Sequence, residues 1–400
     1  MRSFLSHSHH GAAAPAALDD RLHIAHVAFL LLFPGFFFYQ TLLGLGLITS
    51  FLGGYFSEII VIVIVPLLIT YGKKVKGYRL TSRVDLYFAI FILYFLAIIA
   101  ANFFSGANIT TILNHLRAIG YYVALFIIFK TVNLEHRWFK LLLIVSLIAM
   151  AGIIFNYSVE GTFYLAPQHL GQDSDNVATY QGFSRSYFIT LIVVVSFIKR
   201  PHYRAIIYCL AGPALYVNGA RSEFVAMLFM LPIIEIYRSK HKLHALAVIV
   251  AIVAIAAMNF DSIVSVLPSN RMLELLDLSQ STSANARHEL NTQAVVTIEA
   301  NPILGDYASY PPGDYAHNVL SAWVDLGLFG FIFLLALLIV PALLLIPQGL
   351  FGMTISNEYL LAFCLLSVTI FLLFTSHNFT DMTTGAALGA YSNYRSRRTT

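Results

Sequence analysis

Charged residues are scarce in this sequence, and their scarcity excludes an ordinary soluble domain. Asp, Glu, Lys and Arg together make up 11% of the 400 residues, whereas soluble proteins carry about 25%. Hydrophobic residues make up 58%, and long apolar runs recur from Ala25 to Phe374. Because a bilayer core of about 30 Å needs about 20 apolar residues in a helix, the composition predicts an all-α, polytopic membrane protein.

Cysteines are few, and nucleotide-binding motifs are absent. The two cysteines, Cys209 and Cys364, lie inside apolar runs, where a free thiol behaves as a small hydrophobe, so we expect no disulfide. The sequence has no P-loop, no dinucleotide-binding glycine pattern and no cluster of acidic residues suited to a metal. We therefore expect neither a metal nor another cofactor. The net charge of +4 does not predict nucleic-acid binding, because the basic residues follow membrane topology.

About twelve apolar segments predict membrane-spanning helices. They cover approximately residues 24–45, 49–71, 85–103, 110–129, 141–157, 183–198, 205–219, 221–237, 245–259, 318–345, 358–376 and 380–394. The expected organisation is a cytoplasmic tail (1–23), nine spans (24–259), a large external loop (260–316), three spans (317–394) and a second tail (395–400). The last segment, DMTTGAALGAYSNY, is short and mildly polar, so the side of the C-terminus depends on whether it crosses.

Lys and Arg set the expected orientation. If the N-terminus is cytoplasmic and the spans alternate, most of the 24 Lys and Arg residues fall in cytoplasmic segments, as the positive-inside rule requires. Both termini are then cytoplasmic. Since an arginine at a helix centre costs about 2.5–3.5 kcal/mol on insertion, arginines left on the external side or within a span near it are candidates for function. They are Arg117, Arg185, Arg221, Arg271 and Arg287.

The external loop 260–316 contains two helix-like pieces. The first, SNRMLELLDL at 269–278, has Ser269 as a candidate N-cap. The second, 283–300, places apolar residues near one face at helical spacing. It should end near NPILG, because Pro302 and Gly305 disfavour a helix there. We expect this loop to lie on the membrane surface and to cover a site.

The candidate site combines external arginines with a histidine at a span end: Arg185, Arg221, Arg287 and His317. Guanidinium forks match the oxygens of phosphate or pyrophosphate, so two arginines could hold a pyrophosphate leaving group. An imidazole, with an ordinary pKa of about 6.5, suits proton abstraction from a hydroxyl, and beside an arginine cluster it should stay neutral. Further candidates for substrate binding on the same face are Arg117, Tyr315 and Asn318.

These residues also have ordinary structural interpretations. Glutamates close in sequence could pair with Arg221 and Arg287, Arg117 could snorkel to the interface, and Tyr315 could belong to an aromatic belt. His377, in SHNF, is a second histidine at an external span end. It competes with the histidine of the candidate site for the role of base, and composition does not separate the two.

Short motifs follow one another in the second half of the chain. They are ARSEF around Arg221, Ser-x-x-x-Arg at 283–287, NPILG at 301–305, HN at 317–318 and Gly-x-x-Gly at 327–330. In this order, with about a dozen spans and a large loop before the histidine, the chain resembles the O-antigen ligase family. That family lies within a broader group that also contains O-antigen polymerases and some protein oligosaccharyltransferases.

The resemblance implies a glycosyltransferase that moves a glycan from undecaprenyl pyrophosphate to a terminal sugar of the lipid A-core. Such enzymes work on the periplasmic face of the bacterial inner membrane, without a metal or ATP. By position, Arg221 and Arg287 would bind the pyrophosphate and His317 would activate the acceptor hydroxyl. Arg185 has no matched motif, so its role rests on topology.

The partners implied are the undecaprenyl-pyrophosphate-linked glycan donor, the lipid A-core acceptor and membrane lipids. Two alternatives stay open. An O-antigen polymerase would use the same chemistry with a lipid-linked acceptor. A transporter or flippase for a lipid-linked glycan would use the arginines to bind cargo, and no bond would break.

Overall fold

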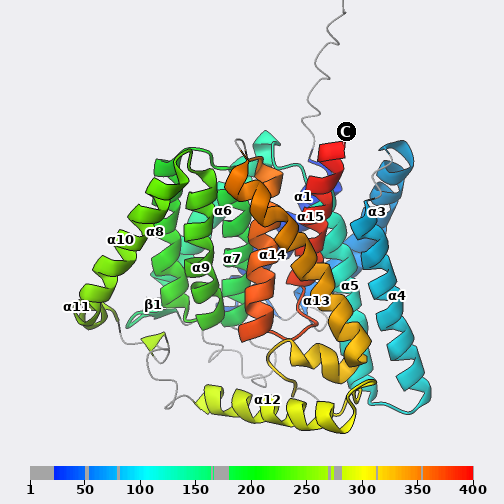
Figure 1. Ribbon diagram of the computed structural model, residues 1–400. Coiled ribbons are helices and arrows are strands. Elements are labelled where there is room, and N and C mark those ends of the chain that lie inside the picture. Colours follow the sequence, from blue (N-terminus) through cyan, green and yellow to red (C-terminus); the bar gives the residue numbers. More distant parts are fainter. Residues whose placement is uncertain are drawn as a thin grey trace, which may run out of the picture.

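The computed structural model describes residues 22–49, 54–78, 82–163, 165, 180–268, 272–273, 282–311, 314–352 and 355–399. In these residues the regular secondary structure is helical except for a small antiparallel hairpin of β1 (Ser158–Val159) and β2 (Thr162–Phe163). Figure 1 shows a bundle of long helices, with α12 (Thr282–Ala300) lying across one end. The predicted all-α class is confirmed.

The first half of the bundle begins with three segments that follow one another without a break. Pro34 lies in the middle one, a π-helical turn, and this wider turn accommodates a ring that would clash in a regular helix. The bounds are α1 (Ile24–Leu30), η1 (Leu31–Gly35), α2 (Phe36–Gly44), α3 (Tyr55–Tyr78), α4 (Arg83–Phe104), α5 (Ile109–Thr131) and α6 (Arg137–Asn156).

The second half runs from α7 to α15. Its bounds are α7 (Tyr180–Phe197), α8 (Pro201–Asn218), α9 (Arg221–Arg238), α10 (Lys242–Met258), α11 (Phe260–Val266), α12, α13 (Leu320–Phe351), α14 (Asn357–Thr375) and α15 (Thr383–Thr399). Each of the predicted spans coincides with a helix. The second span is predicted to begin at residue 49, whereas its helix, α3, begins at Tyr55.

Seven helices within the described residues are long and apolar enough to cross a membrane, or eight if the pair α10 and α11, bent by 72°, counts as one span. The chain is therefore a multi-pass membrane protein. The remaining predicted spans, in α7, α8, α9 and α15, also belong to the bundle (Figure 1). Their crossing, and with it the number twelve, stays a prediction.

Helix α15 is polar for a helix in the middle of a membrane protein, and its packing explains how it is tolerated. Most of its side chains from Thr383 to Asn393 are buried, and it packs mainly against α5 and α14. A Cβ at Gly385 or Gly389 would collide with the backbone of α5 at Tyr122 or Phe126. Small residues thus let the two backbones approach closely, and protein shields the polar side chains from lipid.

Helix α12 confirms the predicted helix at 283–300, whereas the predicted helix at 269–278 lies almost wholly outside the described residues. The buried side chains of Ala294 and Ile298 pack against Tyr310, Ala316 and Val324. This small cluster holds α12 against the start of α13. Helix α12 therefore covers one end of the bundle, and the placement of the whole loop on the membrane surface stays a prediction.

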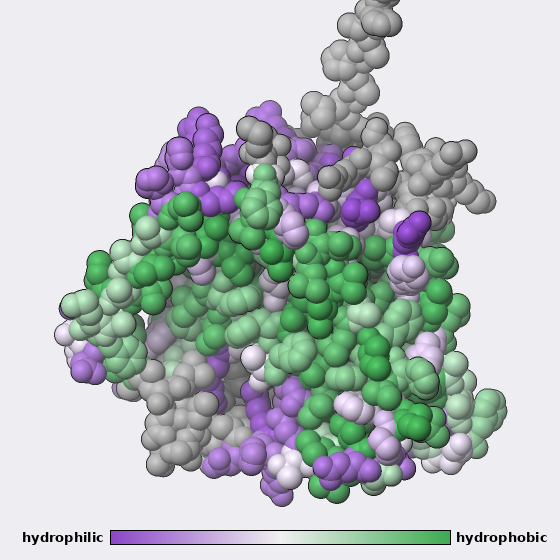
Figure 2. Space-filling model, in the orientation of Figure 1, coloured by the Kyte–Doolittle hydropathy of each residue, from purple (hydrophilic) through white to green (hydrophobic). Residues whose placement is uncertain are grey.

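The two ends of the bundle differ in charge, and Figure 2 shows an apolar belt between hydrophilic ends. We call one of them the basic end, because helices start or finish there with Lys or Arg. Its residues include Arg83, Lys130, Arg137, Arg204, Arg238, Lys242 and Arg395. We call the opposite end, which α12 covers, the cavity end.

Candidate functional site

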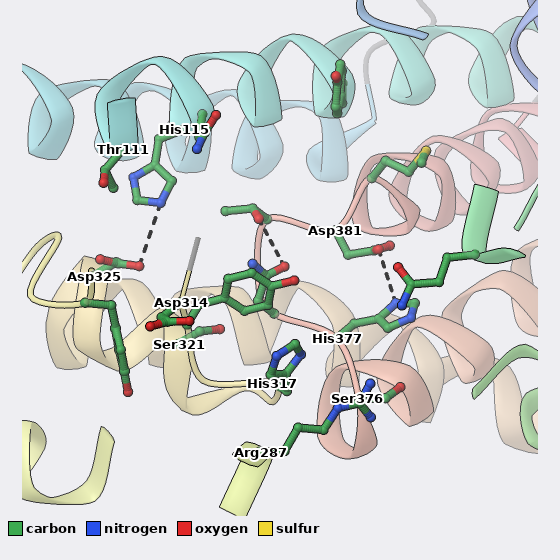
Figure 3. Close-up of a pocket in the computed structure, with 18 of the residues that line it drawn as sticks. Thr111, His115, Arg287, Asp314, His317, Ser321, Asp325, Ser376, His377 and Asp381 are labelled. Atoms are coloured by element: carbon green, nitrogen blue, oxygen red, sulfur yellow. Dashed lines mark hydrogen bonds and ion pairs between the residues drawn. The ribbon is translucent and has the colours of Figure 1, made fainter. Parts of the chain in front are cut away.

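A cavity of about 400 Å³ opens at the cavity end. Its wall combines α5, α7, α9, α12, the start of α13 and the loops before α13 and between α14 and α15. Figure 3 shows the side chains that project into it. The cavity brings together four of the seven predicted site residues, Arg185, Arg287, Tyr315 and His317, and also His377, the competing candidate for the base.

Arg185 is held between two buried carboxylates. Its Nη2 lies 3.0 Å from Asp381 Oδ2, and its Nε lies 4.0 Å from Glu223 Oε1 and makes no hydrogen bond. Glu223 is only 2% exposed. Because a buried carboxylate needs a compensating charge, this pairing fixes the guanidinium at the cavity wall and leaves part of its donor capacity open.

His377 contacts the same two carboxylates as Arg185, and we call these four side chains the charged frame. Its Nδ1 lies 3.1 Å from Asp381 Oδ2 and its Nε2 lies 4.0 Å from Glu223 Oε1. Burial alone would raise the pKa of Asp381, but Arg185 and His377 outweigh burial and hold that pKa well below its usual range. Asp381 is therefore an anion that orients the Arg185 guanidinium. It also orients the His377 imidazole, as Figure 3 shows.

Sequence reasoning missed Glu223 and Asp381 as site residues, because it followed the positive charges alone. The two carboxylates lie on α9 and before α15, so only the fold brings them together. A usable signal was present: a carboxylate at or near a predicted span is expensive unless it is paired, and it marks a functional position by default.

Arg287 reaches the cavity from α12 and extends toward His317 and Ser376 (Figure 3). In the described part of the chain, no ion pair holds its guanidinium. Burial lowers the pKa of His317, and the charges of Arg287 and His377 lower it further, while the Ser376 backbone and Asp314 act in the opposite direction. The result is an imidazole that favours its neutral form.

The geometry distinguishes the two histidines. His377 faces carboxylates with both ring nitrogens, whereas His317 has a tyrosine beside it, with the Tyr315 ring centroid 4.5 Å away. Within the described residues, His317 is not in an ion pair with any carboxylate. This arrangement favours His317 for taking a proton from a bound molecule and His377 for holding the frame.

A second histidine–carboxylate pair lies in the cavity wall. His115 Nε2 is 3.7 Å from Asp325 Oδ2, and His115 Nδ1 is 2.9 Å from the Tyr307 hydroxyl. The Ala308 N–H donates to Asp325 Oδ1 at 3.0 Å. These contacts use the polar atoms of the pair and tie α5 and α13 to the loop that follows α12, so the pair positions that loop.

The motifs NPILG and Gly-x-x-Gly pack on each other. Helix α13 is broken at Gly327, where φ is 68° and ψ is −179°, a conformation open essentially to glycine alone. The NPILG turn fills the break: Leu328 N–H donates to the Ile303 carbonyl at 2.9 Å, and Asp306 N–H donates to the Val324 carbonyl at 2.8 Å. These contacts hold together the two ends of the segment from Asp306 to Val324, which carries His317.

Three of the predicted site residues do not line the cavity. Arg221 begins α9 next to Ser222, which does line it. Arg117 is exposed and donates to Asn114 Oδ1 at 3.1 Å. Asn318 Oδ1 accepts from the Leu320 N–H at 2.9 Å, so this side chain shapes the beginning of α13.

The described residues hold no group of three or more His, Cys, Asp or Glu side chains arranged to bind a metal. The cavity instead contains one guanidinium without an ion-pair partner among the described residues, a second guanidinium fixed by carboxylates, and an imidazole whose lowered pKa favours the neutral form. This set can bind an oxyanion and remove a proton. Comparisons with protein-family models and with curated proteins found no match to the chain.

Proposed function

We propose that this protein is a glycosyltransferase of the O-antigen ligase type. It transfers a glycan from undecaprenyl pyrophosphate to a sugar hydroxyl of the lipid A-core. The observation that carries the proposal is that Arg185, Arg287 and His317 line one cavity at the end of the bundle opposite the basic end. Two guanidinium groups and an imidazole in one cavity support the proposal, because transfer from a pyrophosphate requires an anion site beside a base for the hydroxyl.

The orientation follows from charge. The positive-inside rule assigns the basic end to the cytoplasm. With about twelve spans, both termini are then cytoplasmic, and the cavity faces the periplasm of a bacterial inner membrane. A lipid-linked donor then reaches the cavity from the bilayer, and the acceptor sugar reaches it from the periplasm. Chemistry on that face uses an activated donor and needs no ATP or metal.

In this mechanism Arg185 and Arg287 bind the pyrophosphate. Each charge-assisted hydrogen bond contributes about 1.5–3 kcal/mol. His317 takes the proton of the acceptor hydroxyl as its oxygen attacks the anomeric carbon. The bond between that carbon and the pyrophosphate oxygen breaks, and undecaprenyl pyrophosphate leaves with the electron pair. In-line attack inverts the configuration, and the proton stays on His317.

The roles of the other candidates follow from their positions. Tyr315 lies beside His317 and can stack on a sugar ring. Arg221 and Asn318 act from behind the wall, through the start of α9 and of α13. Arg117 has no direct role in this proposal, because it is exposed and lies outside the cavity lining.

The test is transfer by the full chain reconstituted in vesicles with a lipid-pyrophosphate-linked glycan and a lipid A-core acceptor. Replacing His317 by Ala should lower the rate about 10²–10⁴-fold, the usual contribution of general-base catalysis. The matched control is His202→Ala, an exposed histidine of α8 at the basic end, which should keep full activity.

Other outcomes separate the alternatives. Extension of one lipid-linked glycan by another, with no transfer to the lipid A-core, would indicate a polymerase. Movement of the intact donor across the vesicle membrane, with no bond broken and with His317→Ala still active, would indicate a transporter and would refute the proposal.

A further inference from the structure

A second cavity, of about 540 Å³, lies at the opposite end of the protein and has a different character. Its walls come from α4, α13 and α15. Figure 1 shows α13 diverging from α4 toward the end where α15 finishes. Side chains of α4 and α13 line most of it, among them Val84, Tyr87, Phe333, Leu337, Val340 and Leu344. Tyr87, Val340 and Leu344 are each about half exposed, so this groove is open at the bilayer-facing surface.

The polar residues of the groove lie only at its basic end. Ser82 and Arg83 precede or begin α4, while Arg395 and Ser396 lie near the end of α15. Both arginines are exposed. Among the described residues that line the groove there is no carboxylate. The groove thus offers two guanidinium groups at one end and hydrocarbon along most of the rest. The hydroxyl of Ser82 donates to Asp85 and that of Ser396 to the Ser392 carbonyl, so the arginines carry the polar character of the groove.

The length of the apolar part matches one leaflet. From Phe333 to Leu344 the helical rise along α13 is about 17 Å, and half of a bilayer core is about 15 Å. Because Arg83 and Arg395 stand at the basic end, a ligand that fits must be a chain with an anionic head at the cytoplasmic surface. Basic pockets between membrane helices on that side suit anionic lipid headgroups.

We infer that this groove is a binding site for an anionic phospholipid of the cytoplasmic leaflet. Arg83 and Arg395 would receive the phosphate, and an acyl chain would lie along α13 between Val340 and Phe333. The inference does not depend on the proposed glycosyl transfer, because the groove and the catalytic cavity share no residue.

The isoprenoid tail of a lipid-linked donor is the competing occupant. Such a tail carries its phosphates at the periplasmic end, so it would use the apolar wall of the groove without needing the arginines. Charge complementarity at the basic end favours a phospholipid. The two occupants also predict different consequences of removing the arginines.

The test uses the full chain purified in detergent, stripped of lipid and titrated with phosphatidylglycerol or phosphatidylethanolamine, with bound lipid counted by native mass spectrometry. The wild type should hold one phosphatidylglycerol in preference to phosphatidylethanolamine. The double variant Arg83→Ala/Arg395→Ala should weaken phosphatidylglycerol about 30-fold, because each arginine near an anionic lipid surface contributes about fivefold. The matched control Arg137→Ala/Arg200→Ala removes the same charge from exposed positions at the same end and should leave binding unchanged.

A second variant tests the apolar wall. Ala336→Trp places an indole in the groove, whereas Leu343→Trp changes an exposed residue of the same helix outside it. Only the first should prevent binding. Equal binding of the two lipids, equal losses in the two double variants, or displacement of phosphatidylglycerol by a polyprenyl phosphate would overturn the inference.

Discussion

The two ends of the bundle hold arginine in different ways. At the basic end, Arg204 is 2% exposed, binds both oxygens of Glu235 at 2.6 Å, and donates to the carbonyls of Ile198 and Lys199. At the cavity end, the guanidinium of Arg287 has no ion-pair partner in the described part of the chain. One arginine is saturated by the fold, and the other has its donors available.

The difference teaches which arginines a ligand can use. A guanidinium has five N–H donors, and Arg204 commits its donors to a carboxylate and to carbonyl groups, so it holds α8 to α9. Arg185 is intermediate, since its carboxylate partners fix its position while its Nε makes no hydrogen bond. The sequence alone shows three arginines near helix ends and does not separate these cases.

The largest predicted effects are opposite for the two arginines: one substitution should affect mainly stability and the other mainly activity. Arg204→Ala should lower the free energy of unfolding by about 3 kcal/mol, the low end for breaking a buried pair, because the side chain of Glu235 keeps 29% exposure. Arg287→Ala should leave stability unchanged and reduce glycan transfer about 10- to 100-fold, the value of one charge-assisted hydrogen bond. Thermal unfolding in detergent and the transfer assay measure the two effects.

These two variants check each other. If Arg287→Ala unfolds the protein as readily as Arg204→Ala does, the cavity arginine is a structural residue. Loss of activity by Arg204→Ala at a temperature where it is still folded would equally remove the distinction between the two ends.

A smaller effect concerns the interlock of the two glycine motifs. Gly327→Ala should destabilise the protein by about 1–3 kcal/mol, because an alanine is strained at this backbone conformation and its Cβ would lie 2.6 Å from the Ile303 carbonyl. The control is Gly152→Ala in α6, where no atom lies within 4 Å of the added Cβ; there alanine should stabilise by up to about 1 kcal/mol. Unfolding of both variants in detergent gives the comparison, and equal stability would argue against a rigid interlock.

The sequence was sufficient for the helices and their order. Apolar runs and flanking Lys and Arg predicted helices close to α4, α5, α9 and α14. The weakest prediction, the last span, corresponds to α15, whose polar side chains are buried by neighbouring helices. Hydropathy could not foresee this, because it treats every segment as if lipid surrounded it, whereas α15 lies against α5 and α14.

Predicting the site required contacts that spacing does not encode. Arg185, Arg287 and His317 line one cavity, although they come from three separate elements. The carboxylates Glu223 and Asp381 could not be joined to them from sequence, because a frame of opposite charges depends on which helix ends meet. The motif glycines had a sequence signal, but their mutual contact is a tertiary fact.

The pH dependence of transfer tests whether His317 is the proposed base. Its pKa is lowered by burial and then by Arg287, and the proposed reaction needs the neutral imidazole. Activity should therefore fall with decreasing pH through a limb that lies below the ordinary histidine value of about 6.5. Arg287→Ala removes a charge that lowers this pKa, so the limb should move to higher pH; Asp314→Asn removes a charge that raises it, so the limb should move to lower pH.

The measurement is kcat/KM for transfer as a function of pH, for the wild type and both variants. Opposite displacements are the expected signature. If neither variant moves the limb, the titrating group is not His317, and His377 becomes the candidate base.

The smallest predicted effect is at Arg117. Its side chain is exposed, its hydrogen bond to Asn114 is 3.1 Å long, and it lies outside the cavity lining. Arg117→Ala should therefore change the free energy of unfolding by no more than about 0.5 kcal/mol, as at most surface positions, and leave transfer close to the wild-type rate. Because Arg117→Ala and Arg287→Ala remove the same charge from the same end of the protein, a loss of activity in both would mean that the general field of this end attracts the substrate. A loss in Arg287→Ala alone would mean that the contact made inside the cavity decides.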